Sequence, residues 1–211
     1  MRPSAASATW VDHVNGINPP DKMRSWLTDR VSLTVKLIAC STNFRVRRLA
    51  QQRALCLVDE FAIVGLPRRI CANERDVLLY CDANPVVFAH TIVPTQASAS
   101  DWPFFSSLGE RSLGTTLFGD PLVMRGALQF ARLPARHPLA ARARAAIGGV
   151  EHESPLYARR CLFRRKNGVL LVTEVFLPKI TNLNVQRAAF YTKSFRAGRY
   201  IVNNSHSQSA K

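Results

Sequence analysis

The sequence has no uninterrupted apolar run near the roughly 20 residues that a membrane-spanning helix requires. Its first 15 residues contain no apolar core of the kind found in secretory signal peptides. It has no C-x-x-C pair and no i, i+4 histidine pair, and its five cysteines and five histidines are scattered. We therefore expect reduced thiols, a cytoplasmic location and no metal site.

Acidic residues are scarce. The chain has 14 Asp and Glu residues against 29 Lys and Arg residues, which gives a net charge of +15. Such a surplus attracts anions in general, whether nucleic acid, anionic lipid or a small polycarboxylate, and does not choose among them. No nucleic-acid-binding motif accompanies the basic residues Arg132, Arg136, Arg142 and Arg144, so we expect no specific nucleic-acid partner. A solvated basic surface is the simplest interpretation.

The remaining composition is that of an ordinary globular protein, with 47% hydrophobic and 20% charged residues. A chain of 211 residues is long enough for one good core. We expect a flexible lead-in over residues 1–20, one folded domain over 21–178 and a basic extension over 179–211 that is at least partly disordered. The extension mixes basic and aromatic residues, so weak contact with a membrane surface is a further hypothesis.

The hydrophobic pattern indicates an α+β fold with an antiparallel sheet. Short helices are expected after Asp21 and Ser32, both of which are good N-cap residues, and a third over 137–147. Turn-rich residues 95–121 are expected to cover one face of the sheet. Strands are predicted over residues 44–49, 54–64, 75–81, 86–93, 122–133, 156–165 and 170–177.

The last predicted strand is apolar on both faces, so both faces should be covered. The Asn167-Gly168 pair before it predicts a type I′ hairpin turn. Glu174 shares one face with Leu170, Val172 and Phe176, and an ionised carboxylate there costs several kcal/mol unless it is paired. Two interpretations remain open: a structural Glu bonded to a neighbouring Arg or backbone amide, or a carboxylate whose partner is a ligand hydroxyl.

Eight short motifs follow one another along the chain. They are Trp26-Leu27, Ser32-Leu33-Thr34, Arg75-Asp76-Val77-Leu78-Leu79, Thr91-Ile92-Val93-Pro94, Leu108-Gly109, Leu113-Gly114-x-x-Leu117-Phe118, Leu156-Tyr157-Ala158-Arg159-Arg160 and Leu171-Val172-Thr173-Glu174-Val175-Phe176-Leu177-Pro178. Each motif alone is weak, but their order and spacing are fairly specific. The series resembles chorismate pyruvate-lyase, and the resemblance covers residues 22–178.

The resemblance implies a single domain with about six antiparallel strands, helices packed on them, a buried ligand cavity and no cofactor. It implies cleavage of chorismate to 4-hydroxybenzoate and pyruvate for ubiquinone biosynthesis, with product inhibition. By the same resemblance, Arg75 binds the ligand carboxylate, Glu174 binds its hydroxyl, and Leu33 and Leu113 offer backbone amides. The basic extension lies outside the resemblance.

Chorismate carries two carboxylates, so a second cation is needed for the enolpyruvyl group. Arg159 and Arg160 are the candidates, and a surface role for both is an equal alternative. We expect a monomer. Two other functions are open: a non-catalytic domain of the same fold that binds a small aromatic effector, as in some transcription regulators, and a chorismatase that gives a different hydroxybenzoate.

Overall fold

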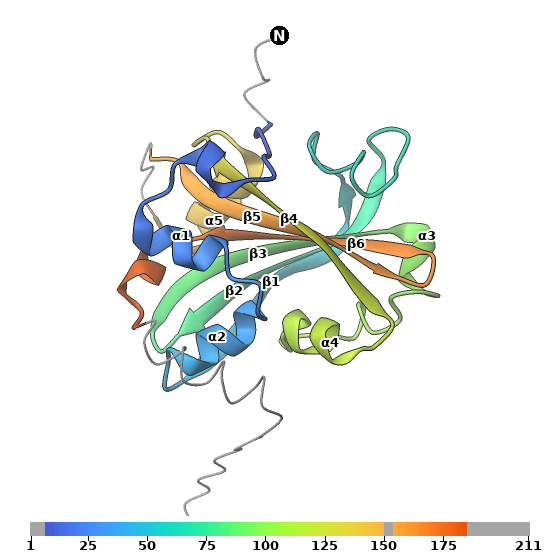
Figure 1. Ribbon diagram of the computed structural model, residues 1–211. Coiled ribbons are helices and arrows are strands. Elements are labelled where there is room, and N and C mark those ends of the chain that lie inside the picture. Colours follow the sequence, from blue (N-terminus) through green and yellow to red (C-terminus); the bar gives the residue numbers. More distant parts are fainter. Residues whose placement is uncertain (1–6, 150–153, 185–211) are drawn as a thin grey trace, which may run out of the picture.

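The computed structural model describes residues 7–149 and 154–184. Six strands form one antiparallel sheet in the order β1-β2-β3-β6-β5-β4 (Figure 1). The strands are β1 (Phe44–Leu55), β2 (Cys71–Cys81), β3 (Asn84–Pro94), β4 (Val123–Leu133), β5 (Leu156–Arg165) and β6 (Gly168–Phe176). The expected α+β fold with a six-stranded antiparallel sheet is confirmed.

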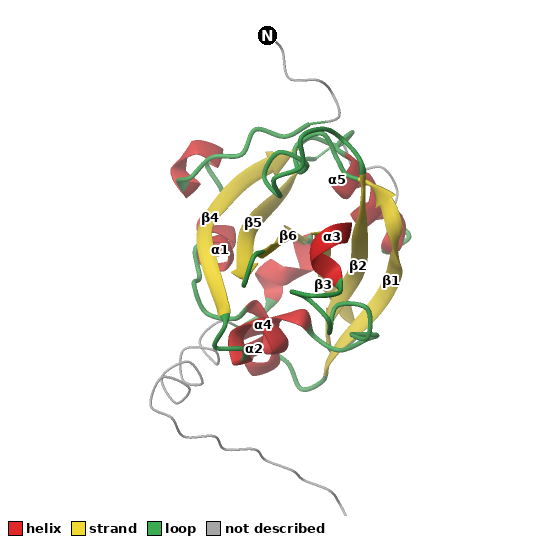
Figure 2. Cartoon of the chain, turned by 90° about the vertical axis from the view of Figure 1, so that its right-hand side faces the viewer, coloured by secondary structure: helices red, strands yellow, loops and turns green. Residues whose placement is uncertain are grey.

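Short helices lie on both faces of this sheet. They are α1 (Asp21–Leu27), α2 (Leu33–Ala39), α3 (Thr95–Ser98), α4 (Leu113–Gly119) and α5 (Pro138–Ala146), with 3-10 turns η1 (Val14–Ile17) and η2 (Pro178–Asn182). Figure 2 shows a strongly curved sheet, with α2 and α4 lying across its concave side. Among the described residues, no helix is long and apolar enough to cross a membrane.

Strand β6 is covered on both faces, as its sequence predicts. Leu170 and Phe176 belong to the core on the concave side, which also contains residues of α1, α2 and α4. Val175 and Leu177 pack on the convex side with residues of α5. The strand therefore joins two cores, which explains why it lacks the polar face of a solvent-exposed strand.

The β5–β6 hairpin forms where it was predicted, but its turn lies one residue earlier. Arg165 pairs with Gly168, so the two loop residues are Lys166 and Asn167. Lys166, rather than Gly168, has the left-handed φ of 52°. Gly168 is required for a different reason, because a Cβ there would lie 2.5 Å from the Cβ of Asp101.

The predicted strand over 54–64 is wrong, because β1 ends at Leu55 and residues 58–65 form turns. Described residues on either side of the predicted domain also pack more closely than expected. Val11 pairs with Phe130 of β4, and Val14 and Ile17 are buried, so this part of the expected lead-in lies against the fold. Beyond position 178, η2 adds a further buried residue to the domain. Most of the basic extension lies outside the described residues.

A buried charged network lies close to β2 and β3. Nδ1 of His90 lies 2.5 Å from an oxygen of Asp76, and its Nε2 lies 3.3 Å from Glu60. Arg142 of α5 binds both Asp76 and Glu74, each at 3.1 Å. Burial alone would lower the pKa of His90, but Glu60 and Asp76 raise that pKa to about 10. The two carboxylates therefore favour the protonated form of His90, which is itself a residue of β3.

Candidate active site

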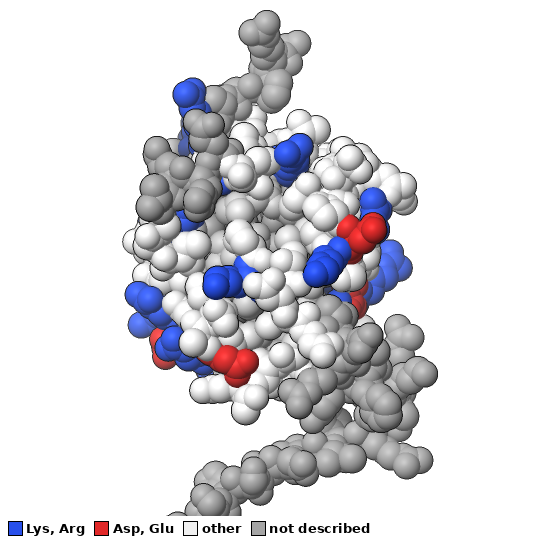
Figure 3. Space-filling view, turned by 90° about the vertical axis from the view of Figure 1, so that its left-hand side faces the viewer, with Lys and Arg blue, Asp and Glu red and all other residues white. Residues whose placement is uncertain are grey.

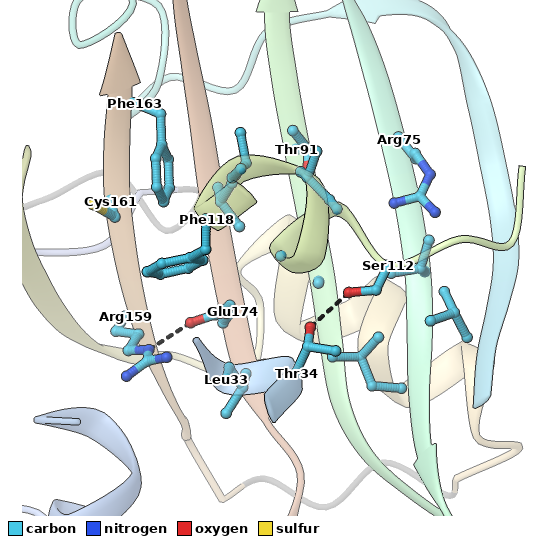
Figure 4. Close-up of a pocket in the computed structure, with 18 of the residues that line it drawn as sticks. Leu33, Thr34, Arg75, Thr91, Ser112, Phe118, Arg159, Cys161, Phe163 and Glu174 are labelled. Carbon is cyan, nitrogen blue, oxygen red and sulfur yellow. Dashed lines mark hydrogen bonds and ion pairs between the residues drawn. The ribbon is translucent and has the colours of Figure 1, made fainter. Parts of the chain in front are cut away.

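A cavity lies between the concave face of the sheet and helices α2 and α4 (Figure 4). Its floor comes from the sheet strands and its roof from the two helices. The lining residues include Leu33 and Thr34 of α2, Leu113, Gly114, Leu117 and Phe118 of α4, and Arg75, Thr91, Arg125, Arg159, Cys161, Phe163, Val172 and Glu174 of the sheet. The cavity thus joins residues from all six strands and from α2 and α4.

Strand register brings Arg75 and Glu174 to one cavity. Arg75 on β2 pairs with Thr91 on β3, and Thr91 pairs with Val172 on β6. Glu174 follows Val172 by two residues and therefore lies on the same face. Two strand spacings, roughly 10 Å, separate β2 from β6. Figure 4 shows Arg75 on one side of the cavity and Glu174 on the other.

Arg75 is almost fully buried, with 2% of its surface exposed. One guanidinium nitrogen, Nη2, donates to the carbonyls of Gly109 and Arg111, at 3.0 and 2.9 Å. Its Nε has no partner, and no carboxylate lies within ion-pair distance of it in the part of the chain that is described. Burial, with a contribution from Arg48, lowers the pKa of Arg75 to about 10. A buried guanidinium without a carboxylate partner is well suited to bind an anionic ligand.

Glu174 has a cationic partner in the cavity. Its Oε2 accepts from Nε of Arg159 at 2.5 Å, and the two residues are directly opposed on β6 and β5. Nη1 of Arg159 also donates to the carbonyls of Trp26, Leu27 and Asp29 at the end of α1. Both interpretations of Glu174 remain compatible with this arrangement, because Arg159 engages Oε2 and the side chain still lines the cavity.

Arg160 lies away from the cavity. It donates to Gln129 at 2.9 Å and to the carbonyl of Asp59 at 2.7 Å, and its guanidinium lies 4.2 Å from the centre of the Trp10 ring. Successive residues of a strand point to opposite faces, so Arg159 and Arg160 must be separated in this way. Neither is a surface residue, since both are less than 10% exposed. Of the two candidates, only Arg159 reaches the cavity.

Leu33 and Leu113 are the first residues of α2 and α4, and both line the cavity. Amide hydrogens in the first turn of a helix have no carbonyl partner within that helix. Leu33 and Leu113 therefore occupy positions suited to offering backbone donors to a ligand. The two helices are linked by a 2.6 Å hydrogen bond between the hydroxyls of Thr34 and Ser112.

Several lining residues were absent from the sequence prediction. Phe118 and Phe163 meet edge to face at 6.4 Å, and the guanidinium of Arg125 lies 5.3 Å from the centre of the Phe118 ring. Cys161 also lines the cavity, and burial raises the pKa of its thiol. Among the described residues, no group of three or more His, Cys, Asp or Glu side chains is placed to hold a metal ion. Phe118 lies in a quoted motif, but no local signal distinguished the others.

Comparison with known proteins gives a consistent result. A family described as chorismate lyase matches residues 4–186. The chain is 52% identical over 157 residues to a probable chorismate pyruvate-lyase of Ralstonia nicotianae, covering 74% of this chain and 80% of that protein. It is 47% identical over 174 residues to another of Cupriavidus metallidurans, covering 82% and 81%.

Among solved structures, the C-terminal domain of the histidine utilization repressor from Pseudomonas syringae has a TM-score of 0.50 and 8% identity. The match covers 65% of this chain and 93% of that domain, and at this identity it shows a shared fold alone. The family match over most of the chain and the identities of 47–52% carry the assignment. The chain is a lyase and belongs to the chorismate lyase family.

Proposed function

We propose that this enzyme cleaves chorismate to 4-hydroxybenzoate and pyruvate, and that it supplies 4-hydroxybenzoate for ubiquinone biosynthesis. The main support for the proposal is that one cavity contains both Glu174 and a buried Arg75 that has no carboxylate partner among the described residues. A ligand with a carboxylate at one end and a hydroxyl at the other satisfies both groups. 4-Hydroxybenzoate has this shape, and so does the ring of chorismate.

The reaction itself is simple in its bond changes. The bond between the ring carbon and the enolpyruvyl oxygen breaks, and the ring carbon that carries the hydroxyl loses its proton. The ring becomes aromatic, the released enol takes up the proton as it becomes pyruvate, and atoms balance without a further reactant. Aromatisation supplies the driving force, so we propose that no cofactor takes part. The protein then has to orient the substrate and stabilise charge as the enol departs.

Each site residue has a role in this scheme. Arg75 binds the ring carboxylate with its planar fork, assisted by the backbone amides of Leu33 and Leu113. Glu174 accepts a hydrogen bond from the ring hydroxyl, which orients the ring and places a base near the proton that leaves. Arg159 holds Glu174 in position through the hydrogen bond from its Nε to Oε2 of Glu174.

Incubation of the purified protein with chorismate tests this function. We expect 4-hydroxybenzoate, followed by its ultraviolet absorbance and identified by chromatography, and an equal amount of pyruvate. Arg132 is exposed on β4, so Arg132→Ala removes one positive charge outside the cavity and serves as the matched control. This variant should react like wild type. Formation of a different hydroxybenzoate would support a chorismatase. Binding of 4-hydroxybenzoate without any turnover would support the effector-binding alternative.

The wider setting is also a proposal. We propose a cytoplasmic monomer whose basic extension makes weak contact with anionic membrane surfaces, where a quinone pathway would use the product. Sedimentation with anionic and neutral liposomes tests the contact, comparing the full chain with a truncation after Asn184. This truncation keeps Ile180, which is fully buried. Equal sedimentation of both proteins would rule out a role for the extension.

A further inference from the structure

A third guanidinium in the cavity also lacks a carboxylate partner. Arg125 of β4 lines the cavity, donates through Nη1 to the carbonyl of Arg30, and lies over the ring of Phe118. Its Nε is buried and has no hydrogen-bond partner within the described part of the chain. Arg125 also has no ion pair there. Arg125 is partly exposed, unlike Arg75, but it shares with Arg75 the lack of a carboxylate partner among these residues.

A β-bulge places Arg125 at the cavity. Arg125 pairs with Phe163 and Leu128 pairs with Cys161, so three steps along β4 match two along β5. The extra residue lets Arg125 share the cavity face with Leu128, which regular alternation would prevent. Gly126 makes the bulge possible, because a Cβ there would lie 2.8 Å from the carbonyl oxygen of Leu162.

The order of the strands places these groups in sequence across the cavity. Arg75 lies on β2, Glu174 on β6, Arg159 on β5 and Arg125 on β4, and the sheet order is β2-β3-β6-β5-β4. In chorismate the ring carboxylate lies opposite the hydroxyl, and the enolpyruvyl ether occupies the carbon next to that hydroxyl. A substrate with its ring carboxylate at Arg75 and its hydroxyl at Glu174 therefore extends its enolpyruvyl group toward β5 and β4.

We infer that Arg125 binds the enolpyruvyl carboxylate of chorismate and so distinguishes the dianionic substrate from the monoanionic product. This inference rests on the proposed function and identifies the residue that binds the second carboxylate of the substrate. Arg159 is less suited to that contact, because Glu174 already opposes its charge and three carbonyls hold its Nη1. Arg160 does not line the cavity.

Kinetics of Arg125→Ala test the inference by comparing chorismate with 4-hydroxybenzoate, because only chorismate has a second carboxylate. We expect kcat/KM for chorismate to fall roughly 30-fold or more, the effect of removing one partner of a buried charge pair. The inhibition constant of 4-hydroxybenzoate should stay within about twofold of wild type, since the product has no second carboxylate. Arg125→Lys should recover part of the loss, and Arg132→Ala should show none.

A merely structural role for Arg125 would give a different pattern. Damage to the cavity would weaken chorismate and 4-hydroxybenzoate together, and this parallel loss would overturn the inference. An unchanged kcat/KM for chorismate would overturn it as well. Calorimetric binding of both ligands to wild type and Arg125→Ala separates the inference from the proposed function: selective loss of chorismate affinity upholds the inference even if wild type binds chorismate without cleaving it.

Discussion

At the scale of single residues, the cavity contains three arginines in two electrostatic states. Arg159 is neutralised by Glu174, whereas Arg75 and Arg125 have no carboxylate partner in the described structure. Burying an uncompensated charge costs free energy that a bound anion recovers. This cost applies to Arg75, which is buried, and the partly exposed Arg125 offers a second cation to the same anionic ligand.

Replacement of Arg75 tests the first of these contacts. Arg75→Ala should weaken 4-hydroxybenzoate binding by roughly 30-fold or more, because it leaves a ligand carboxylate without its bidentate partner. Arg75→Lys should bind better than Arg75→Ala, since it restores the charge without the planar fork. Titration calorimetry gives both affinities. Equal affinities of the two variants would mean that charge at this position contributes nothing to binding.

Glu174 is expected to affect turnover. Glu174→Ala and Glu174→Gln should both lower kcat for chorismate by roughly 100-fold, the usual contribution of a positioned acid–base group. Glu174→Gln keeps the shape and a hydrogen-bond acceptor, so a smaller loss in this variant would indicate a positioning role rather than proton transfer. Steady-state kinetics distinguish the two. A rate near wild type in Glu174→Ala would remove the residue from the mechanism.

His90 should make stability depend on pH. Its pKa is raised from 6.5 to about 10 in the folded protein, so its charge stabilises the fold fully below pH 6.5. This contribution is lost as pH rises through 10. Urea unfolding of His90→Gln should show a loss of roughly 3 kcal/mol at pH 6.5, the cost of breaking a buried pair.

The difference between wild type and His90→Gln should then shrink steadily as pH approaches 10. Comparison with this variant separates the effect of His90 from that of its partners Glu60 and Asp76 and of Arg142 and Glu74, which join the network through Asp76. A difference that stays constant from pH 6.5 to 10 would show that His90 is neutral in the folded protein.

At the scale of elements, close approaches of the chain at glycines fix the geometry of the sheet near the cavity. Gly126 allows the β4 bulge that turns Arg125 inward, and Gly168 allows the β5–β6 hairpin to meet Ala97 and Asp101. Gly126 lies within β4 and Gly168 is the first residue of β6, and both strands contribute site residues. The hairpin aligns Arg159 with Glu174, and the bulge adds a third arginine.

Gly168→Ala should destabilise the fold. The new Cβ would lie 2.5 Å from Cβ of Asp101 and 3.0 Å from Cβ of Ala97, so the expected loss is roughly 1–3 kcal/mol in the free energy of unfolding. Gly119→Ala is the matched control, because its Cβ meets nothing within 4 Å. Urea unfolding should show the control unchanged or up to about 1 kcal/mol more stable. Equal stabilities of the two variants would contradict the close approach at Gly168.

At the scale of the whole molecule, the curved sheet and the helices α2 and α4 enclose a site within a basic protein. Lys and Arg side chains are spread over the face shown in Figure 3, with fewer carboxylates among them. A surface with net positive charge raises the local concentration of anionic ligands, and this effect weakens with salt. The site residues decide which anion binds, and the whole surface affects how fast it arrives.

An enclosed site should hold its product firmly. 4-Hydroxybenzoate keeps the carboxylate contact to Arg75 and the hydroxyl contact to Glu174, so we expect product inhibition in the proposed reaction. At 100 times its Kd the product should raise the free energy of unfolding by about 2.7 kcal/mol. This corresponds to a rise in Tm of roughly 5–10 °C, measured by calorimetry. At the same concentration, a roughly 30-fold weaker affinity in Arg75→Ala should reduce the stabilisation to about 0.9 kcal/mol and the rise in Tm to roughly 2–3 °C. Weak inhibition of wild type would argue against this cavity.

The sequence by itself determined most of the elements, because their signals are local. Alternation of apolar residues predicted the strands and put Glu174 on the correct face with Val172. The two-faced apolar pattern of β6 predicted burial on both sides. The resemblance to the family named Arg75 and Glu174, which the structure places in one cavity. Among these local features, the turn position at Gly168, the strand over 54–64 and the N-cap at Asp21 were misjudged, since Asp21 is the first residue of α1 and Pro20 precedes it as the cap.

Only the tertiary structure decided how those elements meet. The pairing of β3 with β6 joins strands far apart in the chain, and its register places Arg75 opposite Glu174 across the cavity. Alternation showed that Arg159 and Arg160 face opposite ways, but not which one faces the ligand. The bulge that brings in Arg125 has one local signal, Gly126 within a strand, but packing against β5 decides which side chain it turns inward. Long-range register is fixed by burial of whole faces, and no short stretch of sequence contains that information.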